Sequence, residues 1–240
     1  MNDNMVTYSV DMLAKEVLEL YASQTNYSGR LLIGITGGPG VGKTTLAQKL
    51  VAHLNAVSKW EIAAYVPMDG FHMSISKLSY LKLLDRKGAI ETFEAKNYVK
   101  LLKQLKKGIS TSIPIYSREI HDVIPNAYNI EKEKIIITEG NYLLIDKYPW
   151  SEIKNILGTS YFLHEKKEIA FTRLLDRQIA KGKSYAESVS HVSNVDMPNF
   201  DQILSSQQHA KRIIKVDAII PLAPCPSHMI CPAFQNISES

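Results

Sequence analysis

The 240-residue sequence predicts an α/β fold in which a mainly parallel sheet lies between two layers of helices. Three observations lead to this prediction. Short apolar runs alternate with longer stretches of helical periodicity. The runs are nearly continuous instead of alternating with polar residues, as expected of a sheet buried on both faces. Finally, a glycine-rich turn joins the first of these runs to the helix that follows it.

The predicted elements follow one another in a regular order. Residues 8–23 carry apolar side chains at spacings of three and four, which predicts a leading helix with one buried face. Residues 30–35 predict the first buried strand, and residues 46–54 continue as a helix after the glycine-rich turn. Further strands are predicted at 62–66, 135–138, 161–163 and 213–220, and further helices at 93–107 and 166–181.

Composition is that of an ordinary globular protein. The chain is 45% hydrophobic and 22% charged, and 28 Lys and Arg against 24 Asp and Glu give a net charge of +4. This charge is too small to indicate nucleic-acid binding, although it suits an anionic cofactor. No apolar run approaches the roughly 20 residues of a membrane helix, and the N-terminus lacks a secretory signal. We therefore expect a cytoplasmic protein without nucleic-acid or membrane partners.

The domain organisation is expected to be simple. We predict a single domain over residues 1–222, with the leading helix within 1–29 and a lid at about 166–196. Several prolines near the C-terminus cannot continue a regular element, so 223–240 is predicted to be a flexible tail. Both cysteines lie in this tail, so a disulfide scaffold is not expected. The oligomeric state is not readable from the sequence, and a homodimer stays open.

Residues 37–44, GGPGVGKT, match G-x-x-x-x-G-K-[ST] between a predicted strand and a helix, which is the context of a P-loop. The glycines let backbone N–H groups converge on phosphate oxygens beside a helix N-terminus. Lys43 is expected to reach the β- and γ-phosphates, and Thr44 to bind Mg²⁺. A plain glycine turn would explain neither side chain. The sequence thus predicts a P-loop NTPase three-layer α/β/α sandwich that binds ATP and Mg²⁺. The expected nucleotide-binding residues are Gly37, Gly38, Gly40, Val41, Gly42, Lys43, Thr44 and Thr45.

Three further segments indicate what happens to the nucleotide. Asp69 follows the second predicted strand, where a carboxylate can deprotonate an acceptor hydroxyl, although aspartate before glycine is also common in turns. Glu139 follows the strand at 135–138 and can hold Mg²⁺ or polarise the attacking group. Arg173 and Arg177 share one helical face, which can close over a phosphoryl group as a lid, although such faces are often only solvated.

Four patterns occur in a characteristic order: MDGFH at 68–72, RKGAIETFE at 86–94, PIYSREIHD at 114–122 and EGNYLL at 139–144. Together they resemble the uridine kinase, phosphoribulokinase and type I pantothenate kinase superfamily of P-loop small-molecule kinases. The resemblance spans about residues 30–220. Within the superfamily, the chain is most similar to the sugar- or pantothenate-kinase-like group labelled fructose transport system kinases.

The resemblance implies an ATP-dependent kinase that transfers the γ-phosphoryl to a hydroxyl of a small molecule. It implies that Asp69 is the catalytic base and that Glu139 organises Mg²⁺ and the acceptor. Lid arginines matching Arg173 and Arg177 meet the phosphates, and Lys43 completes the expected catalytic set. The metal ligands would be Thr44 and Glu139. The acceptor-binding candidates are His72, Arg86, Tyr116, Arg118 and His121.

The acceptor is less well defined than the donor. True uridine kinases carry a ribose-binding aspartate that has no clear counterpart in Lys87-Gly88-Ala89, so a uridine or cytidine kinase is kept only as an alternative. The basic Arg86-Lys87 run resembles pantothenate kinases and favours a sugar-like or pantothenate-like acceptor. A protein that binds or hydrolyses ATP to signal to a partner is the alternative of another class.

Overall fold

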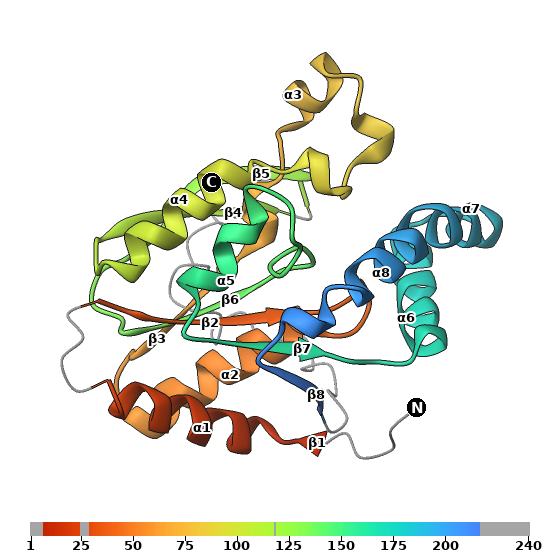
Figure 1. Cartoon of the computed structure of the whole chain (residues 1–240). Coiled ribbons are helices and arrows are strands. Elements are labelled where there is room, and N and C mark those ends of the chain that lie inside the picture. Colours follow the sequence, from red (N-terminus) through yellow and green to blue (C-terminus); the bar gives the residue numbers. More distant parts are fainter. Residues whose placement is uncertain (1–6, 25–28, 118, 217–240) are drawn as a thin grey trace.

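Six strands of the described chain form one sheet, in the order β1-β8-β7-β2-β6-β3 (Figure 1). The structure, a computed structural model, describes residues 7–24, 29–117 and 119–216. Every pair of neighbouring strands in this sheet is parallel, which confirms the predicted sheet. Its strands are β1 (Thr7–Tyr8), β2 (Leu31–Thr36), β3 (Ala63–Pro67), β6 (Ile135–Glu139), β7 (Thr159–Leu163) and β8 (Arg212–Val216).

Helices cover both faces of the sheet and complete the predicted three-layer sandwich. Figure 1 shows α1 and α2 below the sheet, α4 and α5 above it, and α6 and α7 beyond one end. The helices are α1 (Val10–Ala22), α2 (Lys43–Ser58), α3 (Ile75–Tyr80), α4 (Ala95–Lys106), α5 (Ile153–Ile156), α6 (Lys167–Ile179), α7 (Tyr185–His191) and α8 (Met197–Leu204).

Alternate residues of the central strands supply two hydrophobic cores. In β2, Leu31 and Ile33 belong to the core shared with α1 and α2, whereas Leu32 belongs to the core shared with α4. In β6, Ile135 and Ile136 divide between the two cores in the same way. Successive side chains of a strand point to opposite faces. A continuous apolar run therefore fills both cores, as the sequence pattern indicated.

A two-stranded antiparallel hairpin, β4 (Thr111–Ser117) and β5 (Asp122–Ile130), lies apart from the main sheet. The sequence analysis did not predict it. Its strands are partly exposed and carry Pro114 and Pro125, so they lack the continuous apolar runs of the buried strands. The strand register shifts between Ile113 and Ile115, where a proline is tolerated because it need not donate to the ladder.

Some predicted boundaries move by a few residues. Ser9 caps α1 by accepting a hydrogen bond from the backbone N–H of Met12 at 3.1 Å, which begins the helix later than predicted. Residues 7–8 form instead a short strand beside β8, which the sequence analysis did not predict. The end of the strand predicted at 213–220 and the tail predicted at 223–240 lie outside the described residues.

Two excursions of the chain lie beyond the sheet. The first, between β3 and α4, contains α3 and the 3-10 turns η1 (Met68–Phe71), η2 (Leu84–Arg86) and η3 (Ile90–Thr92). The second, between β7 and β8, contains α6, α7, the π-helical turn η5 (Val192–Asp196) and α8. Residues 166–196, predicted as the lid, correspond to α6, α7 and η5.

Candidate active site

The register of three parallel strands brings the central site residues together. Glu139, the last residue of β6, pairs with Ile35 of β2 on one side and with Pro67 of β3 on the other. The P-loop begins directly after β2, and Asp69 lies two residues after Pro67. The P-loop, Glu139 and Asp69 therefore meet at one edge of the sheet, where parallel α/β folds bind their ligands.

The P-loop has a backbone shape that requires glycine. Gly40 and Gly42 have φ angles of 78° and 97°, which side-chain-bearing residues rarely adopt. Gly42 is also the N-cap of α2, so the loop leads straight into a helix N-terminus. At Gly38 an added Cβ would lie 2.4 Å from the Phe200 ring, because α8 packs against the loop. These constraints explain why the motif carries glycine at these positions.

Lys43 is buried at the first turn of α2, and its ammonium donates a hydrogen bond of 2.8 Å to the backbone carbonyl of Gly38. Burial lowers the pKa of Lys43 to about 8, although the carboxylates of Glu139 and Asp69 oppose the shift. The lysine thus lies under the loop with acidic neighbours and is positioned to meet phosphate oxygens above the loop.

Glu139 is buried, and its Oε1 accepts two hydrogen bonds. The hydroxyl of Tyr65 donates at 2.7 Å and that of Thr44 at 3.1 Å. Burial raises the pKa of Glu139, and the nearby Asp69 raises it further, whereas Lys43 and the two hydroxyls oppose the rise. The carboxylate is therefore fixed in orientation beside the P-loop.

The donor atoms at this position fit Mg²⁺. Thr44 and Glu139 offer oxygen atoms side by side, and oxygen is the ligand that Mg²⁺ prefers. Among the described residues no group of three or more His, Cys, Asp and Glu could enclose a metal. The fit is thus to an ion completed by phosphate and water oxygens, which is the usual way that Mg²⁺ binds in nucleotide sites.

A cavity of about 670 Å³ opens above the edge formed by these residues. One wall is made by the P-loop and α6, and another by the first excursion and the hairpin. The cavity joins most of the predicted site residues, including candidates from both halves of the expected reaction. The predicted residues that line it are Gly40, Gly42, Lys43, Thr44, Thr45, Asp69, His72, Tyr116, His121, Glu139, Arg173 and Arg177.

Five predicted residues are not in this lining. Gly37, Gly38 and Val41 are buried in the base of the P-loop. Arg86 is exposed, and its guanidinium pairs with the carboxylate of Glu91, so the structure does not bring it to the cavity. Arg118 lies outside the described residues.

The acceptor-side candidates form a small aromatic group around the end of β3. Nδ1 of His72 lies 2.8 Å from the backbone carbonyl oxygen of Asp69. The centroid of its ring lies 4.1 Å from the ring centroid of Phe93 and 5.0 Å from that of Tyr116. The hydroxyl of Tyr116 donates to the backbone carbonyl of His121 at 3.0 Å. Burial lowers the pKa of His72, which favours its neutral imidazole. This wall can therefore hold a small molecule beside Asp69.

The two arginines of the predicted lid have different surroundings. Arg173 pairs with Glu165 at 3.1 Å and donates to the backbone carbonyl of Gly40 at 3.4 Å, which ties α6 to the P-loop. Arg177 is exposed one turn further along and lines the cavity. Asp196, in the π-helical turn, also lines it; this side chain is buried, and its Oδ2 has no hydrogen-bond partner among the described residues.

Some lining residues were not expected from the sequence. Lys87 takes the place expected for Arg86, and Lys181, Lys183 and Gln178 join the lid arginines. Tyr65 supports Glu139 from the strand β3. Polar residues are common in exposed loops and helix ends, so the residue types at these positions do not by themselves mark a site. For the loop that contains Lys87, the sequence signal was the resemblance of residues 86–94 to a family pattern.

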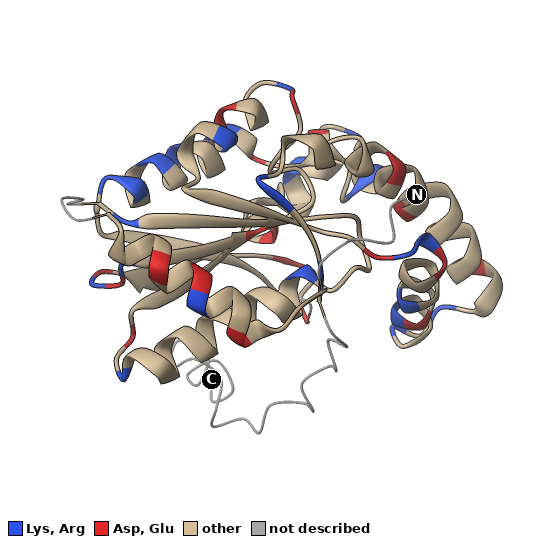
Figure 2. Ribbon diagram, turned by 60° about the horizontal axis from the view of Figure 1, so that its bottom comes forward, with Lys and Arg blue, Asp and Glu red and all other residues tan. Residues whose placement is uncertain are grey.

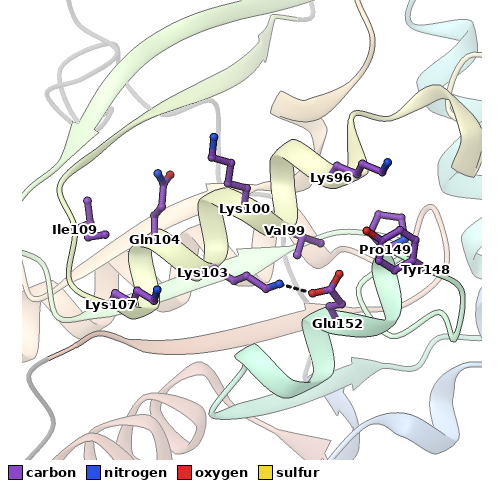
Figure 3. A pocket seen from close by; sticks show the side chains of 10 residues that line it. All are labelled: Lys96, Val99, Lys100, Lys103, Gln104, Lys107, Ile109, Tyr148, Pro149 and Glu152. Atoms are coloured by element: carbon purple, nitrogen blue, oxygen red, sulfur yellow. Dashed lines mark hydrogen bonds and ion pairs between the residues drawn. The ribbon is translucent and has the colours of Figure 1, made fainter.

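A second hollow lies away from this edge, on the outer side of α4 (Figure 3). Its volume is about 380 Å³, and it is lined by several α4 lysines, Tyr148 and Pro149, and Glu152, which pairs with Lys103. It contains none of the predicted site residues. The chemistry gathers instead in the larger cavity at the strand ends.

Charged residues of both signs are spread along the described chain. Figure 2 shows Lys and Arg interspersed with Asp and Glu in that view, as expected from the small net charge. No helix within the described ranges is both long and apolar enough to cross a membrane. The expected cytoplasmic location stays a prediction.

Comparison with known proteins gives consistent matches. The profile of the phosphoribulokinase/uridine kinase family matches residues 32–225. A Schizosaccharomyces pombe protein provisionally named a uridine kinase is 32% identical over 200 residues, 80% of this chain and 83% of that one. Pantothenate kinase of Streptococcus agalactiae is 34% identical over 122 residues, 50% of this chain and 40% of that one. A Silicibacter structure, provisionally named a fructose transport system kinase, has a TM-score of 0.78 at 30% identity and covers 87% of this chain and 98% of that one.

Proposed function

The chain belongs to the phosphoribulokinase/uridine kinase family, a family of ATP-dependent kinases that act on small molecules, and from this premise we propose a reaction for its cavity. The proposed reaction transfers the γ-phosphoryl of ATP to a hydroxyl of a sugar-like or pantothenate-like acceptor. One observation carries the proposal. Strand register brings Glu139 and the segment before Asp69 to one edge of the sheet, and Lys43 lines the same cavity, so the proposed phosphate-binding residue and the proposed base would lie side by side.

The donor half is formed by the P-loop and the start of α2. Backbone N–H groups of the loop and the N-terminus of α2 would hold the β- and γ-phosphates. The Lys43 ammonium would exchange its hydrogen bond with Gly38 for phosphate oxygens. Thr44 and Glu139 would hold Mg²⁺, which neutralises charge on the β- and γ-phosphate oxygens when it is bound.

Asp69 is the proposed base. It is half-buried, lines the cavity and lies next to the acceptor wall formed by His72 and Tyr116. Its carboxylate would accept the proton of the acceptor hydroxyl as the oxygen forms a bond to the γ-phosphorus and the bond from that phosphorus to the ADP oxygen breaks. Arg173 and Arg177 would stabilise the charge on the transferring group from the lid side.

The test is ADP release with MgATP against pantothenate, uridine, cytidine, ribulose 5-phosphate and fructose. We expect at least one acceptor to stimulate release. In Asp69→Asn, which keeps the shape of the side chain, this stimulated rate should fall about 100-fold or more while an ATP analogue still binds. Retained ATP binding with unchanged turnover would remove Asp69 from the mechanism.

The same experiment separates the alternatives. Stimulation by uridine or cytidine alone would establish a nucleoside kinase. A rate of ADP release that no hydroxyl compound changes but a protein partner does change would establish an ATP-dependent signalling protein. The acceptor wall beside Asp69 favours the kinase, because a nucleotide sensor needs no second substrate pocket.

A further inference from the structure

Lys87 is a cation in the acceptor wall. It lies in the first excursion, between η2 and η3, and lines the same cavity as Asp69, Tyr116 and His121. Its neighbour Arg86 points away and is neutralised by Glu91. Of the two neighbouring basic residues, only Lys87 therefore brings a positive charge to the cavity.

The partners of the Lys87 ammonium are neutral. Nζ donates a hydrogen bond of 2.6 Å to the backbone carbonyl of His121 and lies 4.9 Å from the centroid of the Tyr116 ring. Across the parts of the chain that the structure describes, no carboxylate lies within ion-pair distance of it. An ammonium has three N–H donors, and this one uses a single donor for the hydrogen bond to His121. Its charge and remaining donors are available to a ligand.

The surroundings hold this lysine in place. The buried Tyr142 donates to the backbone carbonyl of Gly88 at 2.7 Å, and the N–H of Gly88 donates to the hydroxyl of Thr92 at 3.0 Å. On the other side, His121 adopts a φ of 55°, and its carbonyl accepts hydrogen bonds from both Lys87 and Tyr116. A side chain anchored at its base and its tip loses little further entropy on binding.

Among the described residues of this wall, none other than Lys87 supplies a positive charge as directly. Burial lowers the pKa of His72 and so favours its neutral form, and Lys87 itself contributes to the shift. The other Lys and Arg residues of the lining belong to the P-loop and lid side, where the triphosphate would use them: Lys43, Arg173, Arg177, Lys181 and Lys183. An anionic group on the acceptor would therefore find Lys87 as its counter-charge.

We propose that Lys87 selects an acceptor that carries a carboxylate or phosphate group in addition to the hydroxyl that is phosphorylated. This inference rests on the proposed kinase function. A charge-assisted hydrogen bond between the ammonium and the anion would hold the acceptor across the cavity from the P-loop, with its hydroxyl directed to Asp69. The neutral analogue would lose that bond and leave the ammonium uncompensated.

The experiment compares matched acceptors that differ in the anionic group: pantothenate with panthenol, gluconate with glucose, and ribulose 5-phosphate with ribulose. The first two pairs test a carboxylate and the third a phosphate. kcat/KM is measured for the wild type, Lys87→Met and Lys87→Arg. Lys82→Met serves as control, because Lys82 is exposed in the same excursion and does not line the cavity.

We expect the wild type to favour the anionic member of at least one pair by 10-fold or more. Lys87→Met should lower that ratio by about 10- to 100-fold, mainly through KM of the anionic acceptor. Lys87→Arg should retain most of it, and Lys82→Met all of it. Unchanged binding of an ATP analogue to Lys87→Met would show that the donor half is intact.

Two results would overturn the inference and leave the kinase function standing. One is equal or better use of the neutral members by the wild type. The other is an equal loss of kcat/KM for both members of a pair in Lys87→Met. That result would show that Lys87 only links its loop to the hairpin through the hydrogen bond to His121. If no hydroxyl compound in any pair stimulated ADP release, the proposed function itself would fail and the inference with it.

Discussion

The hydroxyl of Tyr65 donates a hydrogen bond of 2.7 Å to Oε1 of Glu139, the same oxygen that accepts from Thr44. Tyr65 lies on β3 and Glu139 is the last residue of β6, so the bond links two neighbouring strands beside the P-loop. Burial raises the pKa of Tyr65 well above its usual value, so the phenol stays protonated and remains a donor. Tyr65 thus positions the carboxylate that is proposed to hold Mg²⁺.

Tyr65→Phe should therefore weaken Mg²⁺ binding several-fold at neutral pH. The lost hydrogen bond lowers the pKa of Glu139 in the wild type, so its removal should raise that pKa further. The acidic limb of the pH profile should then move to higher pH. The measurement is kcat/KM against pH at several Mg²⁺ concentrations, with Tyr80→Phe, an exposed tyrosine, as control. An unmoved limb would show that Glu139 does not depend on this bond.

ATP binding should weaken above pH 8. The free protein holds Lys43 with a pKa of about 8, so its charged fraction falls as the pH rises through that value. Because phosphates bind the charged form, Kd for ATP should rise toward 10-fold per pH unit above pH 8. Titrations from pH 6.5 to 9.5 would measure it. Lys43→Arg stays charged over this range and should give a flat profile; a flat wild-type profile would contradict the prediction.

The free energy of unfolding of the nucleotide-free protein should rise with pH over the range in which the affinity for ATP falls. The unfolded lysine keeps its proton up to a pKa of 10.5, whereas folded Lys43 releases it near pH 8. Between these values the unfolded state binds more protons, so this site should make the protein more stable as the pH rises. Urea unfolding of the wild type and Lys43→Met between pH 7.5 and 10 would isolate this contribution as a difference in slope.

Arg177→Ala should reduce kcat more than Arg173→Ala does. Arg173 is partly neutralised by Glu165, whereas Arg177 has no ion pair within the described residues and faces the cavity. We expect losses of about 100-fold and about 10-fold, the scale seen when one stabilising donor is removed from a reaction centre. Single-turnover kinetics with saturating ATP would separate these effects from ATP binding. Equal losses would show that the two arginines act as a pair.

Arg30→Met should destabilise the fold by roughly 3 kcal/mol. Arg30 is 3% exposed, and its guanidinium donates to the backbone carbonyls of Glu133, Ile109 and Glu131 at 2.8 to 2.9 Å. The substitution would leave these acceptors without their donor. Arg30→Lys should recover little of the loss, because a single ammonium does not reach all three. Urea unfolding, with exposed Lys15→Met as reference, would check the difference.

The sequence predicts the donor half of the candidate site more fully than the acceptor half. The donor half lies in one continuous segment, so the spacing of Lys43 and Thr44 after the glycines already predicted its form. Asp69 and Glu139 were predicted because each lies close after a predicted apolar strand, and parallel strands end at one edge. The acceptor wall has no such local rule. Arg86 and Lys87 are neighbours in sequence, and only packing shows that one pairs with Glu91 and the other reaches the cavity.

The sequence by itself determined the three-layer α/β/α fold with its parallel sheet, and it predicted a P-loop together with the carboxylates expected at the strand ends. These features depend on periodicity and on short spacings, which a single chain segment contains. Only the tertiary structure decided the β4–β5 hairpin, the support of Glu139 by Tyr65 and the place of Lys87 beside His121. The two side-chain contacts join segments 74 and 34 residues apart, so no local pattern specifies them. The hairpin strands are adjacent in sequence, but they are partly exposed and carry prolines, so they lack the apolar runs that mark the buried strands.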